Sequence, residues 1–132
     1  EDLREMPMTD ASQYLTDNER RDGVIVTQSG LQYEVLESGD GAQPTRSSQV
    51  VTHYRGTFTS GAEFDSSYSR NEPLTFPVTG VIAGWTEALL LMHVGDKWRL
   101  HVPHHLGYGE NDYGPIPGGS VLVFEIELLE VK

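Results

Sequence analysis

The sequence predicts an α+β fold in which an antiparallel five-stranded sheet forms a half-barrel around one short central helix, preceded by an N-terminal helix. Most segments after residue 24 alternate apolar and polar residues, as strands do when one face lies in the core and the other in water. In that region only residues 83–95 repeat apolar residues at a strongly helical spacing. This single helix therefore has to cover the apolar face of the sheet.

The composition limits the size and the class of the protein. The chain has 132 residues with 14 Gly, 7 Pro, no Cys and a formal net charge of −11, and it begins with Glu1, as a processed or trimmed form would. This length suits one compact domain. Because acidic surfaces repel phosphate backbones and anionic lipids, we expect no nucleic-acid or membrane-surface binding. The lack of cysteine excludes disulfides and thiol catalysis, and no apolar run is long enough for a membrane span.

The first 23 residues differ from the rest of the chain. Asp10 and Gln13 resemble a capping box that starts a helix over residues 11–21, and Gly23 provides a stop signal. The apolar face of this helix is thin, so it is marginal alone. Two interpretations stay open: a helix packed loosely beside the main domain, or the end of a longer connecting helix. We expect a helical segment over residues 1–23 and the main domain over residues 24–132.

The first part of the main domain contains alternating strands separated by turns. Strands are expected at residues 31–35 and 49–56. In the first, half-buried strand Leu31, Tyr33 and Val35 alternate with polar residues. In the second, one face consists of Val50, Thr52 and Tyr54 and the other of Val51, His53 and Arg55. Residues 59–67 predict a hairpin, a strand and an irregular loop, with the chain leaving the strand at an Asx turn that starts at Asp65. Residues 74–78 alternate again, and Pro77 indicates an edge strand or a bulge.

The second part contains the central helix and two more alternating segments. The helical repeat consists of Trp85, Ala88, Leu89 and Met92, and we expect the helix to stop at Gly95. Residues 97–102 place Trp98, Leu100 and Val102 on one face and Lys97, Arg99 and His101 on the other. A long Gly/Pro loop follows over residues 103–120. The last strand, residues 121–131, turns Leu122, Phe124, Ile126 and Leu128 inward.

Nucleophilic and metal chemistry find little support in the residues. No serine lies in a G-x-S-x-G elbow. His101, His104 and His105 are close in sequence, but Pro103 interrupts the segment, so we interpret them as solvated surface histidines and expect neither a metal nor another cofactor.

Aromatic residues are the remaining candidates for a site: Tyr54, Phe64, Phe76, Trp85, Trp98, Tyr108 and Phe124. We expect Phe76 and Trp98 to fill the core. The others lie at strand ends, at the helix start or in the loop, where a concave apolar site can open.

Several motifs together resemble the FKBP family of peptidyl-prolyl cis–trans isomerases. They are residues 50–76, residues 81–103, "LGYG" at 106–109 and residues 116–131, within a match from about Gly30 to Lys132. The chain is most similar to the bacterial macrophage-infectivity-potentiator branch, whose members often carry an N-terminal dimerisation region on a long helix. The resemblance therefore implies a homodimer if such a region precedes this chain, in the bacterial cytoplasm or in the periplasm or cell envelope.

The resemblance also implies the site. Its catalytic residues would be Tyr54, Phe64, Asp65, Trp85, Tyr108 and Phe124, and its further substrate- or macrolide-binding residues Arg70, Leu74, Val81, Ile82 and Ile116. In the family, the Trp forms the floor of the prolyl pocket and the Arg pairs with the Asp. The backbone N–H at the Ile82 position and the Tyr108 hydroxyl bind ligand carbonyls.

The implied activity is isomerisation of X-Pro bonds in proline-containing peptides or unfolded proteins, without a cofactor, with inhibition by macrolides such as rapamycin and tacrolimus. Two departures from the family pattern bear on it. Leu74 replaces a common aromatic residue, and the flap, residues 110–120, is slightly short and carries Gly118 and Gly119. The alternative is a non-catalytic proline-binding or chaperone module on the same fold.

Overall fold

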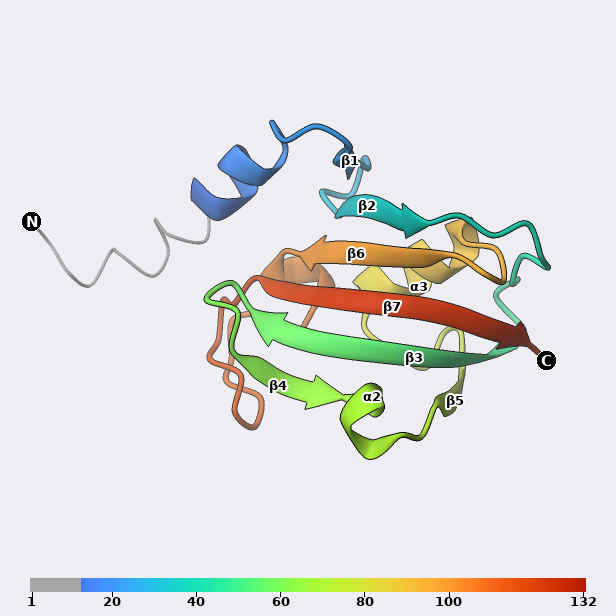
Figure 1. Ribbon diagram of the computed structural model, residues 1–132. Helices are drawn as coiled ribbons and strands as arrows, with labels where there is room; N and C mark the ends of the chain where they lie inside the picture. Colours follow the sequence, from blue (N-terminus) through green and yellow to red (C-terminus); the bar gives the residue numbers. More distant parts are fainter. Residues whose placement is uncertain (1–12) are drawn as a thin grey trace, which may run out of the picture.

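The computed structural model describes residues 13–132 (Figure 1). The strands are β1 (Ile25–Val26), β2 (Gln32–Glu37), β3 (Gln49–Phe58), β4 (Glu63–Ser66), β5 (Leu74–Pro77), β6 (Lys97–Val102) and β7 (Leu122–Val131). The helices are α2 (Ser67–Arg70), α3 (Ala83–Leu91) and the 3₁₀ turn η2 (His104–Leu106), and residues 13–18 are also helical. No helix in this part of the chain is long and apolar enough to cross a membrane.

All strands join one antiparallel sheet with the order β1-β2-β6-β7-β3-β4. Strand β3 is long enough to pair with β5 at its start and with β4 at its end. Helix α3 lies behind the sheet in the view of Figure 1. The predicted α+β class is confirmed. The sheet of residues 13–132 has seven strands rather than five: the short strand β1 was not predicted, and the predicted segments at 59–67 and 74–78 form the separate strands β4 and β5, which both pair with β3.

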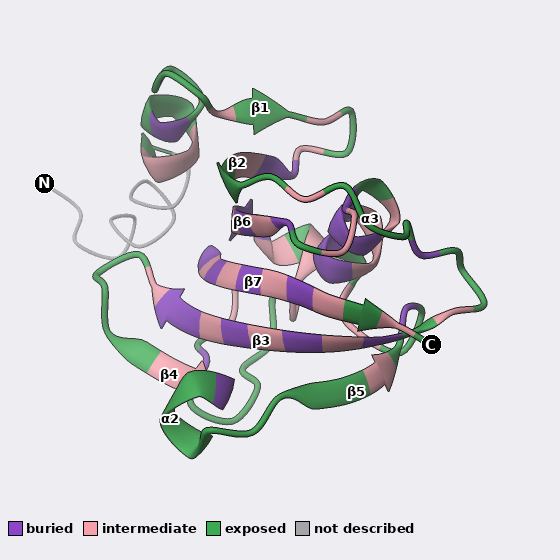
Figure 2. Cartoon of the chain, turned by 45° about the vertical axis from the view of Figure 1, so that its right-hand side comes forward, coloured by how far each residue is buried: buried purple, intermediate pink, exposed green. Residues whose placement is uncertain are grey.

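The core lies between α3 and the three long strands. Burial alternates along β3 and β7, which appear as bands of purple and pink in Figure 2. The predicted inward residues of β7 are buried, as are all four residues of the helical repeat. On β3 and β6 the buried face is the one predicted to carry Val50, Thr52 and Tyr54 and the one predicted to carry Trp98, Leu100 and Val102. Pro77 lies on β5, which pairs only with β3 and is therefore an edge strand, as predicted. A proline is tolerated there because no strand on the other side needs its missing N–H.

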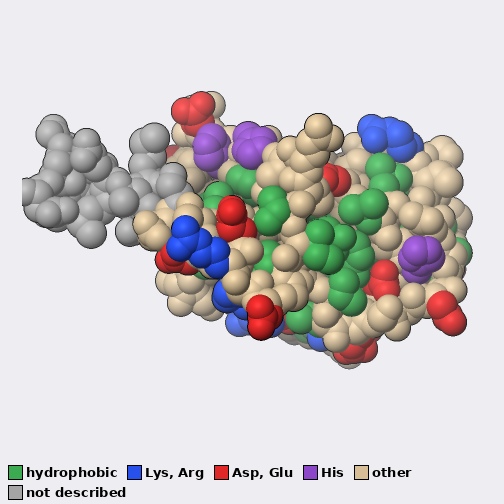
Figure 3. All heavy atoms as spheres, turned by 90° about the horizontal axis from the view of Figure 1, so that it is seen from above, with side chains coloured by type: hydrophobic (Ala, Val, Ile, Leu, Met, Phe, Trp, Pro, Cys, Tyr) green, Lys and Arg blue, Asp and Glu red, His purple; other side chains and the backbone are tan. Residues whose placement is uncertain are grey.

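Strand β2 departs from its predicted pattern. Val35 is 46% exposed although it lies opposite Trp98 in the register. The ring of Tyr33 stacks flat on Trp98, with centroids 4.1 Å apart and an interplanar angle of 3°, and covers it instead. Exposed apolar residues also occur at Ile25, Val26 and Leu36, and Figure 3 shows hydrophobic side chains gathered between charged groups on the face seen from above.

Two predicted boundaries were wrong for local reasons. The chain stays in β4 through Ser66 instead of leaving at Asp65, because the Ser66 side chain caps α2 by accepting a hydrogen bond from the Ser69 N–H at 3.3 Å. Helix α3 ends at Leu91, before Gly95. The Asp96 carboxylate organises the turn that follows, since it accepts hydrogen bonds from the backbone N–H groups of His93 and Gly39.

The N-terminal helical segment (residues 13–18) covers the outer face of β2 and β6. The predicted helix over residues 11–21 is confirmed over residues 13–18, while Asp10 lies outside the described residues. Asn18 donates to the Gln32 side chain at 2.7 Å, and Gln32 donates to the Leu15 carbonyl at 3.0 Å. These buried hydrogen bonds give the helix a defined position on the sheet.

His101 is the second attachment point for this segment. It is 1% exposed, so the prediction that it is a solvated surface histidine was wrong. Its Nδ1 lies 2.8 Å from the Tyr14 hydroxyl and its Nε2 lies 2.7 Å from Glu34 Oε2, which also accepts from Arg21 at 2.7 Å. The alternating pattern placed this side chain correctly on the outer face, but the helix removes that part of the face from water.

Candidate active site

A cavity of about 420 Å³ opens on the concave side of the sheet, between β3, β4, the start of α3 and the loop after η2. Its lining residues are Tyr54, Phe64, Asp65, Leu74, Gly80, Val81, Ile82, Trp85, Tyr108, Tyr113 and Phe124. The fold thus brings together all predicted site residues except Arg70, which bonds to two of them, and Ile116, a flap residue that is buried in the core. The roles assigned to these residues stay predictions.

Trp85 lies at the centre of the aromatic lining. It belongs to the first turn of α3, and it is 6% exposed. Tyr54 and Phe124 both meet it nearly edge to face with centroids 5.2 Å away, and Phe76 packs on it at 5.6 Å. Edge-to-face contacts of this kind are favourable because the positive ring edge meets a negative ring face. The partly buried Phe76 and the buried Trp98 both pack with the core, as predicted.

Gly56 allows two aromatic rings to meet above β3. The rings of Phe64 and Phe124 approach edge to face, with centroids 5.7 Å apart. A Cβ atom on residue 56 would lie 2.8 Å from Phe64 Cζ and 2.9 Å from Phe124 Cε1, so a side chain there would force these rings to shift. Because Gly56 has no side chain, the rings of Phe64 and Phe124 can form two walls of the cavity.

A polar cluster borders the aromatic lining. The Tyr54 hydroxyl donates to Asp65 Oδ2 at 2.6 Å, and Arg70 donates both to Asp65 Oδ1 at 2.6 Å and to the Tyr54 oxygen at 3.0 Å. Burial alone would raise the pKa of Asp65, but the hydrogen bonds from Tyr54 and Arg70 and the positive charge of Arg70 lower it. Asp65 is therefore ionised at neutral pH.

The short helix α2 positions Arg70 for this cluster. Ser66 caps its start, and Asn71 ends it in the left-handed conformation at φ 52°. Buried Ser67 ties the helix to β3, since its hydroxyl accepts from the Tyr54 N–H at 2.7 Å and donates to the Tyr54 carbonyl at 3.2 Å. A helix of four residues has no periodicity that a sequence pattern can reveal, so this element was missed.

The start of α3 supplies backbone donors. Val81 and Ile82 line the cavity, and Ile82 is the N-cap residue of the helix. The Ile82 N–H has no acceptor among the described residues, and the first N–H groups of a helix lack partners within it. A carbonyl group in the cavity can accept a hydrogen bond there.

The loop after η2 provides two tyrosines, of which Tyr113 lies in the flap. Tyr108 and Tyr113 stack nearly parallel, with centroids 4.3 Å apart and an interplanar angle of 9°. Burial raises the pKa of Tyr108, as do Tyr113 and the charge of Asp65, so its hydroxyl stays protonated and can donate. Leu74, which also lines the cavity, is 37% exposed. Tyr113 and Gly80 were not predicted as lining residues.

Comparison with known proteins identifies the architecture. The family model described as "FKBP-type peptidyl-prolyl cis-trans isomerase" matches residues 41–129. The chain belongs to the FKBP-type peptidyl-prolyl cis-trans isomerase family. The predicted family is therefore confirmed. A second model, "Domain amino terminal to FKBP-type peptidyl-prolyl isomerase", matches residues 3–35 of this FKBP-type chain.

Curated relatives match nearly the whole chain. It is 53% identical over 119 residues to the FKBP-type 22 kDa peptidyl-prolyl cis-trans isomerase of Escherichia coli (strain K12), covering 89% of this chain and 58% of that protein. It is 43% identical over 120 residues to the outer membrane protein MIP of Legionella longbeachae, covering 90% and 52%. The FKBP-type chain thus spans about half the length of the curated relatives that it matches.

Solved structures agree with the fold. FkpA from Escherichia coli superposes with a TM-score of 0.92 at 43% identity, covering 96% of this chain and 59% of that one. A peptidyl-prolyl cis-trans isomerase from Pseudomonas syringae superposes with a TM-score of 0.90 at 32% identity, covering 100% and 98%.

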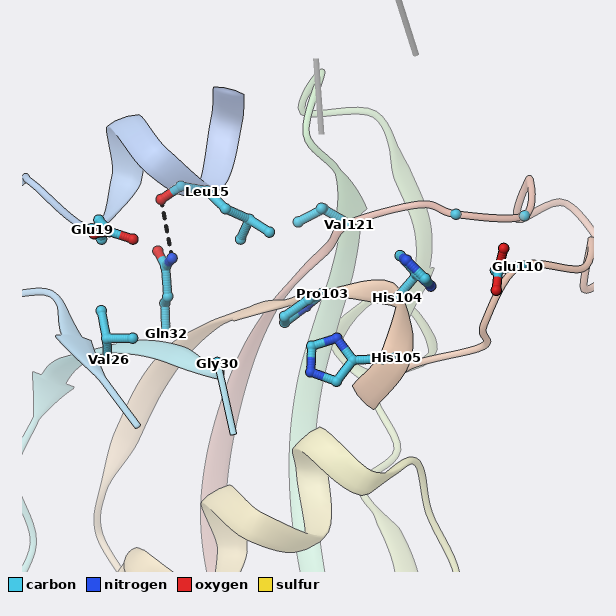
Figure 4. Close-up of a pocket in the computed structure, with 12 residues that line it drawn as sticks. Leu15, Glu19, Val26, Gly30, Gln32, Pro103, His104, His105, Glu110 and Val121 are labelled. Carbon is cyan, nitrogen blue, oxygen red and sulfur yellow. Dashed lines mark hydrogen bonds between the residues drawn. The ribbon is translucent and has the colours of Figure 1, made fainter. Parts of the chain in front are cut away.

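A second cavity, of about 550 Å³, lies behind the flap of this FKBP-type chain (Figure 4). Leu15 and Glu19 of the N-terminal part border it on one side, and Glu110 and Gly118 of the flap on another. In Figure 4 the rings of His104 and His105 lie below the flap, beside Pro103. Within residues 13–132, His, Asp and Glu side chains form no group of three that could hold a metal ion.

Proposed function

We propose that this chain catalyses the cis–trans isomerisation of X-Pro bonds in proline-containing peptides and unfolded proteins. The observation that carries this proposal is the convergence of aromatic rings on Trp85 around a concave apolar cavity. Family membership supports the same activity. In this proposal the prolyl ring lies against Trp85, and assistance to protein folding follows from the reaction.

The reaction requires rotation of one bond. Amide resonance opposes that rotation with a barrier of roughly 18–20 kcal/mol. The twisted amide loses the charge separation of the planar form, so an apolar site that excludes water favours it over the planar form. The side chains of Phe64, Trp85 and Phe124 would provide this environment. Bond rotation alone forms no covalent intermediate, so the proposed route uses no cofactor.

The polar groups would fix the substrate rather than react with it. The Ile82 N–H and the Tyr108 hydroxyl would bind the carbonyl groups on either side of the proline and hold the peptide in a turn-like shape. Asp65 would act as a fixed negative charge that orients Tyr54, because the charge of Arg70 keeps it ionised.

We also propose that the macrolides rapamycin and tacrolimus bind in the same cavity. Their binding would exclude the prolyl ring from Trp85 and inhibit the reaction. The division of the chain after Gly23 and a homodimer through additional N-terminal sequence stay predictions. The sheet and the residues that line the cavity nevertheless lie within residues 24–132.

The test measures cis-to-trans isomerisation of a short X-Pro peptide with and without excess rapamycin. Acceleration that rapamycin abolishes supports the proposal. The Leu91→Ala variant, which changes an exposed residue outside the cavity, serves as a control and should match the unmodified chain. Rapamycin binding without acceleration would support the non-catalytic binding module. The feature that favours this alternative is the partly exposed Leu74, which replaces a common aromatic residue of the family. A chain that neither binds rapamycin nor accelerates isomerisation would overturn both proposed functions.

A further inference from the structure

The cavity behind the flap is a second concave site that the proposed reaction does not use. Its volume of about 550 Å³ falls within the range of roughly 300–1,000 Å³ that is usual for small-molecule sites. None of the described residues that line it also lines the cavity around Trp85. The ligand that fits it therefore has to be inferred from its own lining.

The middle of this cavity is apolar. Leu15 and Val121 point toward each other across it in Figure 4, and Pro103 lies below them. Val26, which also lines the cavity, is 47% exposed. An aliphatic chain placed along these residues would remove their apolar surface from water, which favours binding.

A carboxylate lies on either side of this apolar stretch. Figure 4 shows Glu19 beside the N-terminal helical segment and Glu110 on the opposite side, at the base of the flap. Neither carboxylate forms an ion pair with a residue of the range 13–132, whereas Glu34, Glu63 and Glu125 all do. No Lys or Arg side chain of the same range lines the cavity. The negative charges of the lining are therefore not compensated within this part of the chain.

The other polar groups of the lining leave acceptors rather than donors free. His105 Nε2 lies 2.8 Å from the Ser29 carbonyl oxygen, and because a carbonyl only accepts, Nδ1 of the neutral ring is an acceptor. Several N–H groups of the lining already have acceptors within the chain: the backbone N–H groups of Gly30, Gly118 and Gly119 and the side-chain amide of Gln32. An anion would thus meet two carboxylates and few free donors, whereas positively charged N–H groups would meet acceptors.

We propose that this cavity binds a linear aliphatic diamine or polyamine in its protonated form. One terminal ammonium group would pair with Glu19 and the other with Glu110, and the methylene chain would lie along Leu15 and Val121. A ligand with a single charge would leave one carboxylate unpaired, and a compact cation would not reach both. The inference goes beyond the proposed isomerase function and does not depend on it.

A diamine bound in this way would fasten the flap to the N-terminal part of the chain. Hydrogen bonds join the base of the flap to η2, since the Gly109 N–H donates to the His104 carbonyl at 2.9 Å and the Gly119 N–H donates to the Gly109 carbonyl at 2.8 Å. The two arms of the flap touch there, because a Cβ atom on Gly118 would overlap the Glu110 carbonyl oxygen. A restraint on Glu110 therefore acts on the whole base of the flap.

The experiment titrates the ¹⁵N-labelled chain with octane-1,8-diamine, 8-aminooctan-1-ol and octane-1,8-diol at low salt and follows the amide resonances of Gly30, Gly118 and Gly119. The three probes have the same length and differ only in charge. The dissociation constant of the diamine should be about 2- to 5-fold lower than that of the amino alcohol, a factor typical of one more exposed ion pair, and the diol should bind most weakly. Glu19→Gln and Glu110→Gln should each weaken diamine binding by about 2- to 5-fold.

Two further measurements complete the test. Glu37→Gln is the matched control, because it removes an exposed acid outside the cavity from a chain of net charge −11. It should change the dissociation constant by less than about 1.5-fold. Hydrogen exchange of the Gly119 amide should slow by about tenfold at a diamine concentration of about ten times the dissociation constant, since the ligand would hold the base of the flap closed.

Three results would overturn the inference or its link to the flap. Equal binding of the diamine and the amino alcohol would mean that the second carboxylate takes no part. A loss in Glu37→Gln as large as in Glu19→Gln would assign binding to the overall negative charge of the chain. Diamine binding that leaves the exchange of the Gly119 amide unchanged would separate the cavity from the flap. Failure of the proposed isomerase function is a distinct result, because no proline peptide enters these measurements.

Discussion

The two faces of the sheet differ in the number and environment of their polar groups, although the same strands form both. On β3, Tyr54 and Gly56 face the aromatic cavity, whereas His53 and Arg55 lie on the outer face. On the concave face the polar groups are few, and those of Tyr54 and Asp65 are fixed by hydrogen bonds. Polar groups of this kind can orient a substrate because their positions are set before it binds.

The outer face carries alternating charges across neighbouring strands. Glu63 accepts from Arg55 at 2.9 Å, Glu125 accepts from Arg99 at 3.1 Å, and Arg99 lies 3.7 Å from Glu34. Water screens most of these pairs, so each contributes little to stability. The exception is the region beneath the N-terminal helical segment, where Glu34 and His101 are largely shielded. Burial, rather than the number of charges, decides which polar groups matter.

The largest expected effect concerns the floor of the cavity. Trp85→Ala should lower the free energy of unfolding by about 3–5 kcal/mol, because it removes a buried ring that several other rings contact. Isomerase activity should fall further than in Tyr108→Phe, which removes one hydroxyl and leaves the ring. Urea unfolding and peptide isomerisation measure the two quantities. Equal or reversed losses of activity would contradict the pocket described here.

The next effect tests whether the outer face is separate from the site. Glu34→Ala leaves the buried Nε2 of His101 without its partner and removes one of the two acceptors of Arg21, so we expect a loss of about 1–3 kcal/mol in the free energy of unfolding. Isomerase activity should stay within about twofold, since Glu34 does not line the cavity. The matched control is Glu37→Ala, which removes an exposed acid from the same strand. A large loss of activity at unchanged stability would show that the two faces are coupled.

A smaller effect depends on pH. Burial lowers the pKa of His101 below 6.5, although the hydrogen bond and charge of Glu34 oppose this shift. The unfolded chain then binds a proton at a higher pH than the folded chain, so stability falls as the pH drops from 6.5 toward the folded-state value. The lowered pKa values of Glu34 and Asp65 act in a more acidic range, below 4.5 and 3.8.

The measurement is the free energy of unfolding between pH 7.5 and pH 5 by urea titration, a range of about 2.5 pH units chosen to span the histidine window. The His101→Gln variant should show a flatter profile than the unmodified chain. An identical slope in both proteins would assign the pH dependence to other groups.

The smallest effect is expected for an exposed ion pair. Arg55→Ala removes the 2.9 Å contact to Glu63, in which both side chains are more than a third exposed. The free energy of unfolding should change by less than about 1 kcal/mol, and by less still at high salt. Thermal unfolding at two salt concentrations measures this. A change as large as that of Glu34→Ala would remove the distinction between shielded and screened charges.

Periodicity predicted the core well because it depends only on which face of an element a residue occupies. The inward residues of β3, β6 and β7 and the helical repeat of α3 followed from it. The burial of His101 could not, because it depends on a helix that lies far away in sequence. Tyr113 was missed for a similar reason: its position comes from the flap turn, and loop residues carry no repeating pattern.

Gly56 also constrains how the cavity can change over evolutionary time. A residue with a Cβ atom there would approach ring atoms of both Phe64 and Phe124 too closely, so a substitution at 56 requires these two side chains from other strands to shift. If the rings do not shift, they have to be replaced by smaller residues before position 56 can change, and each such replacement would widen the cavity. Because residue 56 is a glycine, the residues allowed at positions 56, 64 and 124 depend on one another.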